Sequence, residues 1–267
     1  MTKTYTLMRA RQRDRRHLLR GAVAAAGAAM LTGCDRLSNN EAFVATLKSA
    51  QKLNHVVARV VAPHGALAQE FSEGDIAPVF RGNGTLDPMD ADYVALREAG
   101  FAGYKLQVGG LVDKPAEFTL DELRAMPSRT QITRHDCVEG WSCIGKWKGV
   151  QLAHILDQVQ PKSEAKFVVF RCFDSMDMPS PGSDSRYYES IDLAEARHAQ
   201  TLLAYELNDK TLPVTNGAPL RCRVERQLGY KQAKYIRSIE LVASFAPIRG
   251  GKGGYWEDEG YEWYGGI

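Results

Sequence analysis

A short segment gathers most of the side chains in this chain that could do chemistry, and a single cysteine, Cys137, lies at its centre. Its neighbours combine an imidazole, two carboxylates, an indole and a second thiol: His135, Asp136, Glu139, Trp141 and Cys143. A thiolate is both a nucleophile and a soft metal ligand, and imidazole and carboxylate groups hold metals or move protons. The segment therefore indicates metal, nucleophilic or redox chemistry at Cys137.

Zinc binding and nucleophilic catalysis each lack part of what they require. A structural zinc site needs four ligands, and His135, Cys137 and Cys143 supply three, with no second Cys-x-x-Cys or His-x-x-x-His pair in the sequence. A cysteine nucleophile needs a histidine base, for which His154 or His198 could serve. The residues around Cys137 do not resemble the flanks of a cysteine protease, which weakens this second hypothesis.

The other thiols leave a redox pair and a structural disulfide open. Of the five cysteines, those beyond Cys34 are Cys137, Cys143, Cys172 and Cys222. In an oxidising compartment, Cys137 and Cys143 could close a small loop as a disulfide. A redox pair prefers the tight Cys-x-x-Cys spacing, whereas five residues separate these two thiols. One hypothesis for the whole protein is therefore a cofactor-free periplasmic binding module with a Cys137–Cys143 disulfide.

Composition indicates an ordinary globular protein. The 267 residues are 44% hydrophobic and 25% charged, which suits one large or two small domains with a substantial core. Lysine and arginine total 34 against 32 acidic residues, so the formal net charge is only +2. Such a balance does not indicate nucleic-acid binding, and no nucleic-acid partner is expected.

The N-terminus is typical of an export signal. Two arginines, Arg15 and Arg16, precede the short apolar run 21–32, which is too short to span a bilayer as a stable anchor and resembles a twin-arginine signal. The run ends in Leu-Thr-Gly-Cys, which resembles a lipobox and predicts acylation of Cys34. We therefore expect the protein on the periplasmic side of the bacterial inner membrane, anchored by lipid at Cys34 after export.

The periodicity of the rest of the chain predicts short strands interleaved with short helices. Thr119 and Glu122 form a capping-box pattern at the start of one helix. Expected strands lie at 104–110, 131–135, 166–172, 187–193, 220–225 and 236–243, and expected helices near 43–53, 90–99, 152–156 and 193–198. Segment 202–210 is expected to lead into a turn. This order predicts the α+β class with a mixed β-sheet.

The segment Cys-Val-Glu-Gly-Trp-Ser at 137–142, together with 145–152, resembles the sulfite oxidase superfamily, specifically its bacterial branch of periplasmic catalytic subunits that reduce methionine sulfoxide in proteins. Segments 202–221 and 228–236 are similar to the family's second and third signatures. The resemblance implies a sulfite-oxidase-like molybdopterin-binding fold with one molybdenum-molybdopterin per chain. It also implies that Cys137 is the protein's thiolate ligand to the metal, because a soft thiolate suits a redox-active oxo-metal.

The resemblance also implies which residues bind the cofactor. By position, these are Asn83, Cys172, Asn216, Arg221, Gln232, Ala233 and Lys234. Tyr187 aligns with a tyrosine that faces the metal in sulfite oxidases, so we expect it to act in catalysis by donating a hydrogen bond to a metal-bound oxygen or to substrate. In a strand, Tyr188 would face the opposite side. Cys172 departs from the family, which has threonine there in the sulfoxide reductases.

The implied organisation has four parts. Residues 1–33 are the signal, 34–77 a tether, 78–248 the molybdopterin-binding oxidoreductase domain, and 249–267 a Gly-rich aromatic tail. The tail's aromatic side chains are expected to pack on the surface of the domain, with a role in covering a site as the alternative.

The implied reaction is two-electron oxygen-atom transfer in the cell envelope. Where animal and plant sulfite oxidases have a cationic segment, this chain has Val138, Glu139 and Gly140, and an acidic neighbour repels sulfite. Reduction of a sulfoxide or a related S- or N-oxide, small or protein-bound, is therefore the leading hypothesis, with sulfite oxidation as the alternative. The sequence has no Cys-x-x-Cys-His haem motif, so we expect a separate electron-transfer partner, such as a membrane cytochrome or quinone-linked protein. A monomer is expected because no immunoglobulin-like dimerisation domain follows residue 243.

Overall fold

The computed structural model describes residues 39–61, 65–176 and 185–267. The predicted export signal and lipobox lie outside these residues. Contacts divide the chain into two units, Met1–Val60 and Val61–Ile267, and each is described by itself. In the first unit, helix α2 (Glu41–Val61) is longer than the predicted amphipathic stretch and exposes the side chains of Phe43, Leu47 and Leu53. Among the described residues, no helix is both long enough and apolar enough to cross a bilayer.

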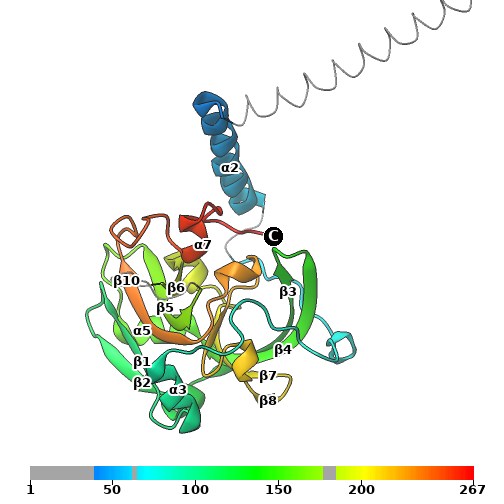
Figure 1. Ribbon diagram of the computed structural model, residues 1–267, viewed down its shortest axis with the longest axis vertical. Coiled ribbons are helices and arrows are strands. Elements are labelled where there is room, and N and C mark those ends of the chain that lie inside the picture. The colour runs from blue at the N-terminus through cyan, green and yellow to red at the C-terminus, as the bar shows by residue number, and fades with distance from the viewer. Residues whose placement is uncertain (1–38, 62–64, 177–184) are drawn as a thin grey trace, which may run out of the picture. The chain divides into compact units, whose positions relative to one another are not determined.

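Two five-stranded sheets form the frame of the second unit (Figure 1). The mixed sheet has the order β2-β1-β10-β5-β6, in which the β1–β10 pair is parallel. Its strands are β1 (Lys105–Gly110), β2 (Ala116–Thr119), β5 (Phe167–Ser175), β6 (Arg186–Asp192) and β10 (Ile236–Val242). The antiparallel sheet has the order β3-β4-β7-β8, and β9 also pairs with β7. Its strands are β3 (Ser128–Cys137), β4 (Trp141–Gln151), β7 (Leu202–Leu207), β8 (Lys210–Thr211) and β9 (Arg221–Arg223).

Short helices connect these strands. The α-helices are α3 (Ala91–Glu98), α4 (Leu120–Ala125), α5 (Leu152–Val159), α6 (Leu193–Ala196) and α7 (Tyr255–Asp258), and the 3-10 helices are η1 (Glu73–Asp75), η2 (Val214–Asn216) and η3 (Gly229–Lys231). The predicted capping box of α4 is confirmed, because the Thr119 hydroxyl accepts from the Glu122 amide at 3.2 Å and the Glu122 carboxylate accepts from the Thr119 amide at 2.7 Å. The α+β class and the mixed sheet predicted from the sequence are also confirmed.

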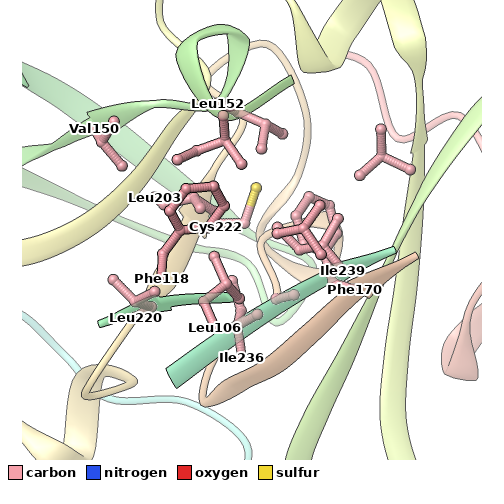
Figure 2. Packing of buried hydrophobic residues seen from close by; sticks show 14 of the residues in the cluster. Leu106, Phe118, Val150, Leu152, Phe170, Leu203, Leu220, Cys222, Ile236 and Ile239 are labelled. Carbon is pink, nitrogen blue, oxygen red and sulfur yellow. The ribbon is translucent and has the colours of Figure 1, made fainter. Parts of the chain in front are cut away.

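The main hydrophobic core is built by both sheets (Figure 2). The mixed sheet contributes side chains such as Leu106, Phe170 and Ile239, while Leu203 of β7 and Cys222 of β9 come from the antiparallel sheet. All of these are at most 2% exposed. Burial of so much apolar surface against both sheets fixes their inner faces, so the strand ends that carry polar residues are held in defined places.

The paired strands β3 and β4 are longer than the sequence indicated, and they are curved in Figure 1. Residues 141–151 were not predicted to be a strand, and segment 202–207 forms β7 instead of leading directly into a turn. Glycines weaken strand propensity, which is why β4 was missed. The fold requires them, because a Cβ at Gly145 would lie 2.8 Å from the Phe80 ring and one at Gly149 would lie 2.2 Å from the Leu203 carbonyl oxygen.

Part of the segment expected to be a tether packs against the second unit. Gln200 accepts from the amide of Ala68 at 2.7 Å, and the amide of Phe71 donates to the carbonyl of Ile132 at 2.9 Å. The second contact, with a β-bridge between Glu70 and Thr133, extends β3 on its outer edge, so residues from about 68 onward belong structurally to the folded body.

The close contact at Gly149 generates a stability prediction. Gly149→Ala should lower the free energy of unfolding by about 1–3 kcal/mol, because the added methyl group meets rigid backbone of β7. Gly109→Ala in β1 is the control, since a Cβ there meets no atom within 4 Å. Urea unfolding of both variants measures the difference, and equal effects of the two would contradict the close-approach explanation.

Candidate functional site

A cavity of about 160 Å³ lies beside Cys137. It brings together six residues that the sequence predicted as site residues, from five separate stretches of the chain: Asn83, Cys137, Tyr187, Arg221, Gln232 and Lys234. Three other predicted residues, Cys172, Asn216 and Ala233, do not line it. Cys172 and Ala233 are each 1% exposed and pack in the hydrophobic core, whereas Asn216 lies directly against Arg221. Their predicted contacts with a cofactor stay predictions.

Cys137 is the last residue of β3, as the sequence predicted, and its thiol is free. The chain turns back directly after it, where Gly140 adopts a φ of 83° and donates its amide to the Cys137 carbonyl at 3.0 Å. Burial raises the pKa of the thiol, a hydrogen bond from the backbone of Glu139 lowers it, the Glu139 carboxylate raises it, and Arg81 and Arg221 lower it. A thiol at a strand end beside a cavity is positioned to bind a ligand inside that cavity.

The hypothesis of a Cys137–Cys143 disulfide is wrong, because both thiols are free. In the β3–β4 register, Cys137 lies opposite Trp141 and Cys143 lies opposite His135, so the two cysteines are not cross-strand partners. The thiol of Cys143 lies 3.7 Å from the carbonyl oxygen of Val79. The binding-module hypothesis loses the disulfide on which it depended.

Arg221 presents a buried guanidinium group that forms no ion pair within the described part of the chain. Its side chain is 1% exposed, and its Nη1 donates to the Asn216 carbonyl at 3.2 Å. Among the described residues, its Nε and Nη2 atoms have no hydrogen-bond partner. Burial lowers the pKa of Arg221 to about 9, and the neighbouring Arg223 lowers it as well. An arginine cannot accept hydrogen bonds, so these atoms suit an anion such as phosphate, which a guanidinium binds through two parallel N–H groups.

Lys234 joins the loop 81–85, which contains Gly82 and Gly84, to the rest of the site. Its Nζ donates to the carbonyls of Asn83 at 2.5 Å and Thr85 at 2.6 Å. Burial lowers the pKa of Lys234 to about 8, with Arg221 adding to the effect and Asp174 opposing it. The cavity therefore holds two cationic groups beside the thiol, and the loop that carries Asn83 closes against one of them.

Tyr187 lines the cavity, but its hydroxyl is already engaged. The phenol donates to the carbonyl oxygen of Tyr230 at 2.5 Å, so in this geometry its proton does not point at a cavity ligand. Tyr188 faces away, as expected for the next residue of a strand, and donates to Asp258 at 2.5 Å. The predicted catalytic role of Tyr187 stays a prediction that requires its hydroxyl to exchange partners.

Several residues around the cavity were not singled out as its components. Asp174, Tyr230, Trp256 and Tyr261 line it, the last two from the C-terminal tail. His135 lies close by, fully buried, with its Nδ1 3.2 Å from the Arg223 guanidinium. The alternation of buried residues along β3 could have placed His135 on the face of Cys137. The tail has no such periodicity that would have revealed its position.

Buried polar atoms without partners test whether a molybdopterin cofactor fits. Beside the free donors of Arg221 lie the Nδ2 atom of Asn216, the Oδ1 atom of Asn83 and the Nε2 atom of His135, all buried and unpartnered among the described residues. A pterin with its phosphate offers donors and acceptors for such atoms, so the residues present fit the group. No cluster of three or more His, Cys, Asp or Glu side chains in the described part of the chain could hold a bare metal ion, which leaves the zinc hypothesis without support.

This combination of two packed sheets, a free thiol and unpaired donors defines a cofactor-dependent oxidoreductase. Residues 94–247 match the family model described as the oxidoreductase molybdopterin-binding domain. The chain belongs to this family, within the sulfite oxidase superfamily that its sequence resembles, and it is an enzyme of the oxidoreductase class.

Curated relatives match along the chain to different extents. One from Azospira oryzae, described as a candidate protein-methionine-sulfoxide reductase subunit YedZ1, is 37% identical over 94% of this chain and 87% of its own length. The protein-methionine-sulfoxide reductase catalytic subunits MsrP of Xanthomonas axonopodis pv. citri and Campylobacter jejuni are 41% and 35% identical over 52% of this chain. The chain spans slightly under half the length of these two, 45% and 49%.

A solved structure, the sulfane dehydrogenase SoxCD from Paracoccus pantotrophus, matches 56% of this chain and 40% of its own. The TM-score of this match is 0.48 and the sequence identity is 21%.

The buried carboxyl of Asp174 generates a prediction about pH. Burial raises the pKa of Asp174 from 3.8 to about 6, so the folded protein takes up a proton between about pH 4 and 6 that the unfolded chain does not hold. The contribution of this group to stability therefore falls as pH rises through that window. The melting temperature of Asp174→Asn minus that of the parent should therefore be higher at pH 7.5 than at pH 4.

Thermal melts of cofactor-free protein across this range measure the effect, with the exposed Asp113→Asn as the control. A difference in melting temperature between Asp174→Asn and parent that does not change with pH would refute the assignment.

Proposed function

We propose that the protein reduces a neutral sulfoxide, or a related S- or N-oxide, by two-electron oxygen-atom transfer with a bound molybdenum-molybdopterin. The observation that carries this proposal is the free, buried thiol of Cys137 in one cavity with the unpaired guanidinium of Arg221. When bound, the cofactor supplies a metal centre that exchanges an oxygen atom and two electrons with its substrate. The balanced reaction converts a sulfoxide, two electrons and two protons into a sulfide and water.

Five polar residues in or beside the cavity would take part in binding the cofactor. Cys137 supplies the thiolate ligand to the metal, and the fork of Arg221 holds the phosphate. Asn83 and Asn216 provide an acceptor and a donor for the polar edges of the pterin, since their Oδ1 and Nδ2 atoms are buried without partners. Lys234 holds the loop of Asn83 against the cavity.

A carboxylate near the thiol favours an uncharged substrate. Glu139 lines the cavity and accepts from the indole of Trp141 at 2.8 Å. Its charge opposes ionisation of Cys137, while Arg81 and Arg221 favour ionisation. A carboxylate in this position repels an anion such as sulfite but not a neutral sulfoxide. The names of the relatives from Azospira, Xanthomonas and Campylobacter, all methionine-sulfoxide reductase subunits, support reduction as the direction.

The cellular setting belongs to the same proposal. The paired arginines and the Leu-Thr-Gly-Cys sequence support twin-arginine export and lipid anchoring of Cys34 at the periplasmic side of the inner membrane. Electrons would come from a separate membrane cytochrome or quinone-linked protein, because the sequence has no haem-attachment motif. The substrate is either a small molecule or an oxidised residue of a protein, and the enzyme acts as a monomer.

A pair of assays tests the direction of the reaction. Purified holoenzyme with a reduced viologen dye should turn over methionine sulfoxide, and with an artificial electron acceptor it should oxidise sulfite at a far lower rate, at most about one hundredth. Glu139 is the physical reason for the difference, because it disfavours the anion. Turnover confined to sulfite would overturn the proposed direction.

Cofactor content tests the assigned ligands. Cys137→Ser should abolish turnover, by at least about a hundredfold, since an alcohol replaces the soft thiolate ligand. Arg221→Lys should lower the pterin and molybdenum recovered per chain, because a lysine cannot form the two parallel contacts of a guanidinium. Arg237→Lys, exposed on β10, is the matched control and should retain both. Mass analysis of released pterin and elemental analysis of molybdenum measure these contents, and stoichiometric cofactor in Arg221→Lys would refute its role.

A further inference from the structure

The C-terminal tail supplies one wall of the cavity. Trp256 and Tyr261 both line it, and their rings are stacked with centroids 5.3 Å apart and an interplanar angle of 30°. The ring of Tyr230 meets Tyr261 edge-on at 5.4 Å. These aromatic side chains line the same cavity as Cys137, so a ligand that enters the cavity can meet both the thiol and this wall.

A buried ionic group holds the tail at this position. The Nζ atom of Lys231, in η3, lies 2.5 Å from Glu189 Oε1 of β6 and 2.5 Å from Glu257 Oε1 of α7. The three side chains are at most 1% exposed. Burial raises the pKa of the Glu189 carboxyl well above its ordinary range. The lysine thus joins two carboxyl groups in a place closed to water, where removal of any one of the three leaves a buried polar group without its partner.

Other contacts also hold this part of the tail: Tyr188 donates to Asp258 of α7, the Ser190 hydroxyl donates to the carbonyl of Gly253, and Trp256 packs against the main hydrophobic core. Helix α7 has four residues, and no side chain caps its N-terminus. Gly254 leaves space for the two carboxylates, because a Cβ there would lie 2.0 Å from Glu257 Oε2 and 2.8 Å from Glu189 Oε1. Removing charged groups from water is costly, and well-packed apolar residues stabilise a fold at least as well as a buried ion pair does. Stability alone therefore does not explain this buried ionic group. The contacts of the ionic group are directional, and Glu257 is the direct neighbour of Trp256. Fixing Glu257 therefore also fixes the position of Trp256.

We propose that Lys231, Glu189 and Glu257 are positioning residues that hold Trp256 as a binding wall for the apolar group attached to the substrate's sulfur. This inference rests on the proposed sulfoxide reduction and adds its selectivity. An aromatic face attracts methyl and methylene groups and favours sulfur at its edge. The wall therefore selects neutral sulfoxides with aliphatic chains, such as the side chain of oxidised methionine, over the smaller dimethyl sulfoxide.

The test compares steady-state kinetics of holoenzyme variants with a dye reductant and two substrates, methionine sulfoxide and dimethyl sulfoxide. Trp256→Ala should raise KM for methionine sulfoxide about tenfold and change it less for dimethyl sulfoxide, with kcat within about twofold of the parent. Glu257→Ala should change KM in the same way. Glu257→Gln should have a KM close to that of the parent, because an amide oxygen still accepts from Lys231. Glu259→Ala, which removes an exposed carboxylate from the same segment, is the control.

The double variant Trp256→Ala/Glu257→Ala separates positioning from a general loss of structure. If Glu257 acts through Trp256, the double variant should be no worse than Trp256→Ala, whereas additive effects would overturn the positioning role. Hydrogen exchange should show faster exchange of backbone amides in 253–263 of Glu257→Ala and parental exchange in β3. If Glu257→Ala does not fold, Trp256→Ala alone decides, because a parental KM in that variant overturns the wall.

Failure of the inference and failure of the proposed function give different results. Parent enzyme that lacks molybdenum or does not turn over methionine sulfoxide refutes the proposed function. Parent enzyme that is loaded and active, with Trp256→Ala and Glu257→Ala showing parental KM for both substrates, refutes only the positioning of the aromatic wall. The inference would also be overturned if Glu257→Ala lost its molybdenum while Glu257→Gln kept it. That result would show that the ionic group retains the cofactor and does not position the wall.

Discussion

Two guanidinium groups lie over the fully buried ring of Trp147, and only one of them has an acid to balance its charge. Arg223 is paired with Glu225 at 2.5 Å, both side chains fully buried, with its guanidinium carbon 4.4 Å from the indole centroid. Arg221 lies at 5.3 Å from the same centroid and faces the cavity instead. An uncompensated buried cation is strongly unfavourable, which sets a requirement for charge compensation at Arg221 that an anion bound in the cavity would meet.

The surrounding elements make that requirement possible. Trp147 can lie under both arginines because Gly145 and Gly149 on either side leave room for Phe80 and β7. The same strand pair carries Cys137, so Trp147 beneath the cations and the proposed metal ligand share one register. Arg221 itself comes from β9, which pairs with β7.

The sequence was informative where chemistry is local or periodic. Cys137 at the end of a strand, the capping box of Thr119 and the strands of the mixed sheet could all be predicted, because each depends on neighbours along the chain. The tail could not, since Glu257 finds Lys231 and Glu189 only through tertiary packing. For Tyr187 the position beside the cavity could be predicted, but its hydrogen-bond partner could not. Nothing in the sequence reveals that its hydroxyl donates to the carbonyl of Tyr230.

The hydrogen bonds of Lys234 to the carbonyls of Asn83 and Thr85 have a consequence for maturation of the enzyme. They hold a loop against a cavity where the cations of Arg221 and Lys234 disfavour each other. A ligand that binds only the folded state and neutralises those charges would stabilise that state by mass action. The thermal stability of the whole domain would then report how far the protein is loaded with its cofactor.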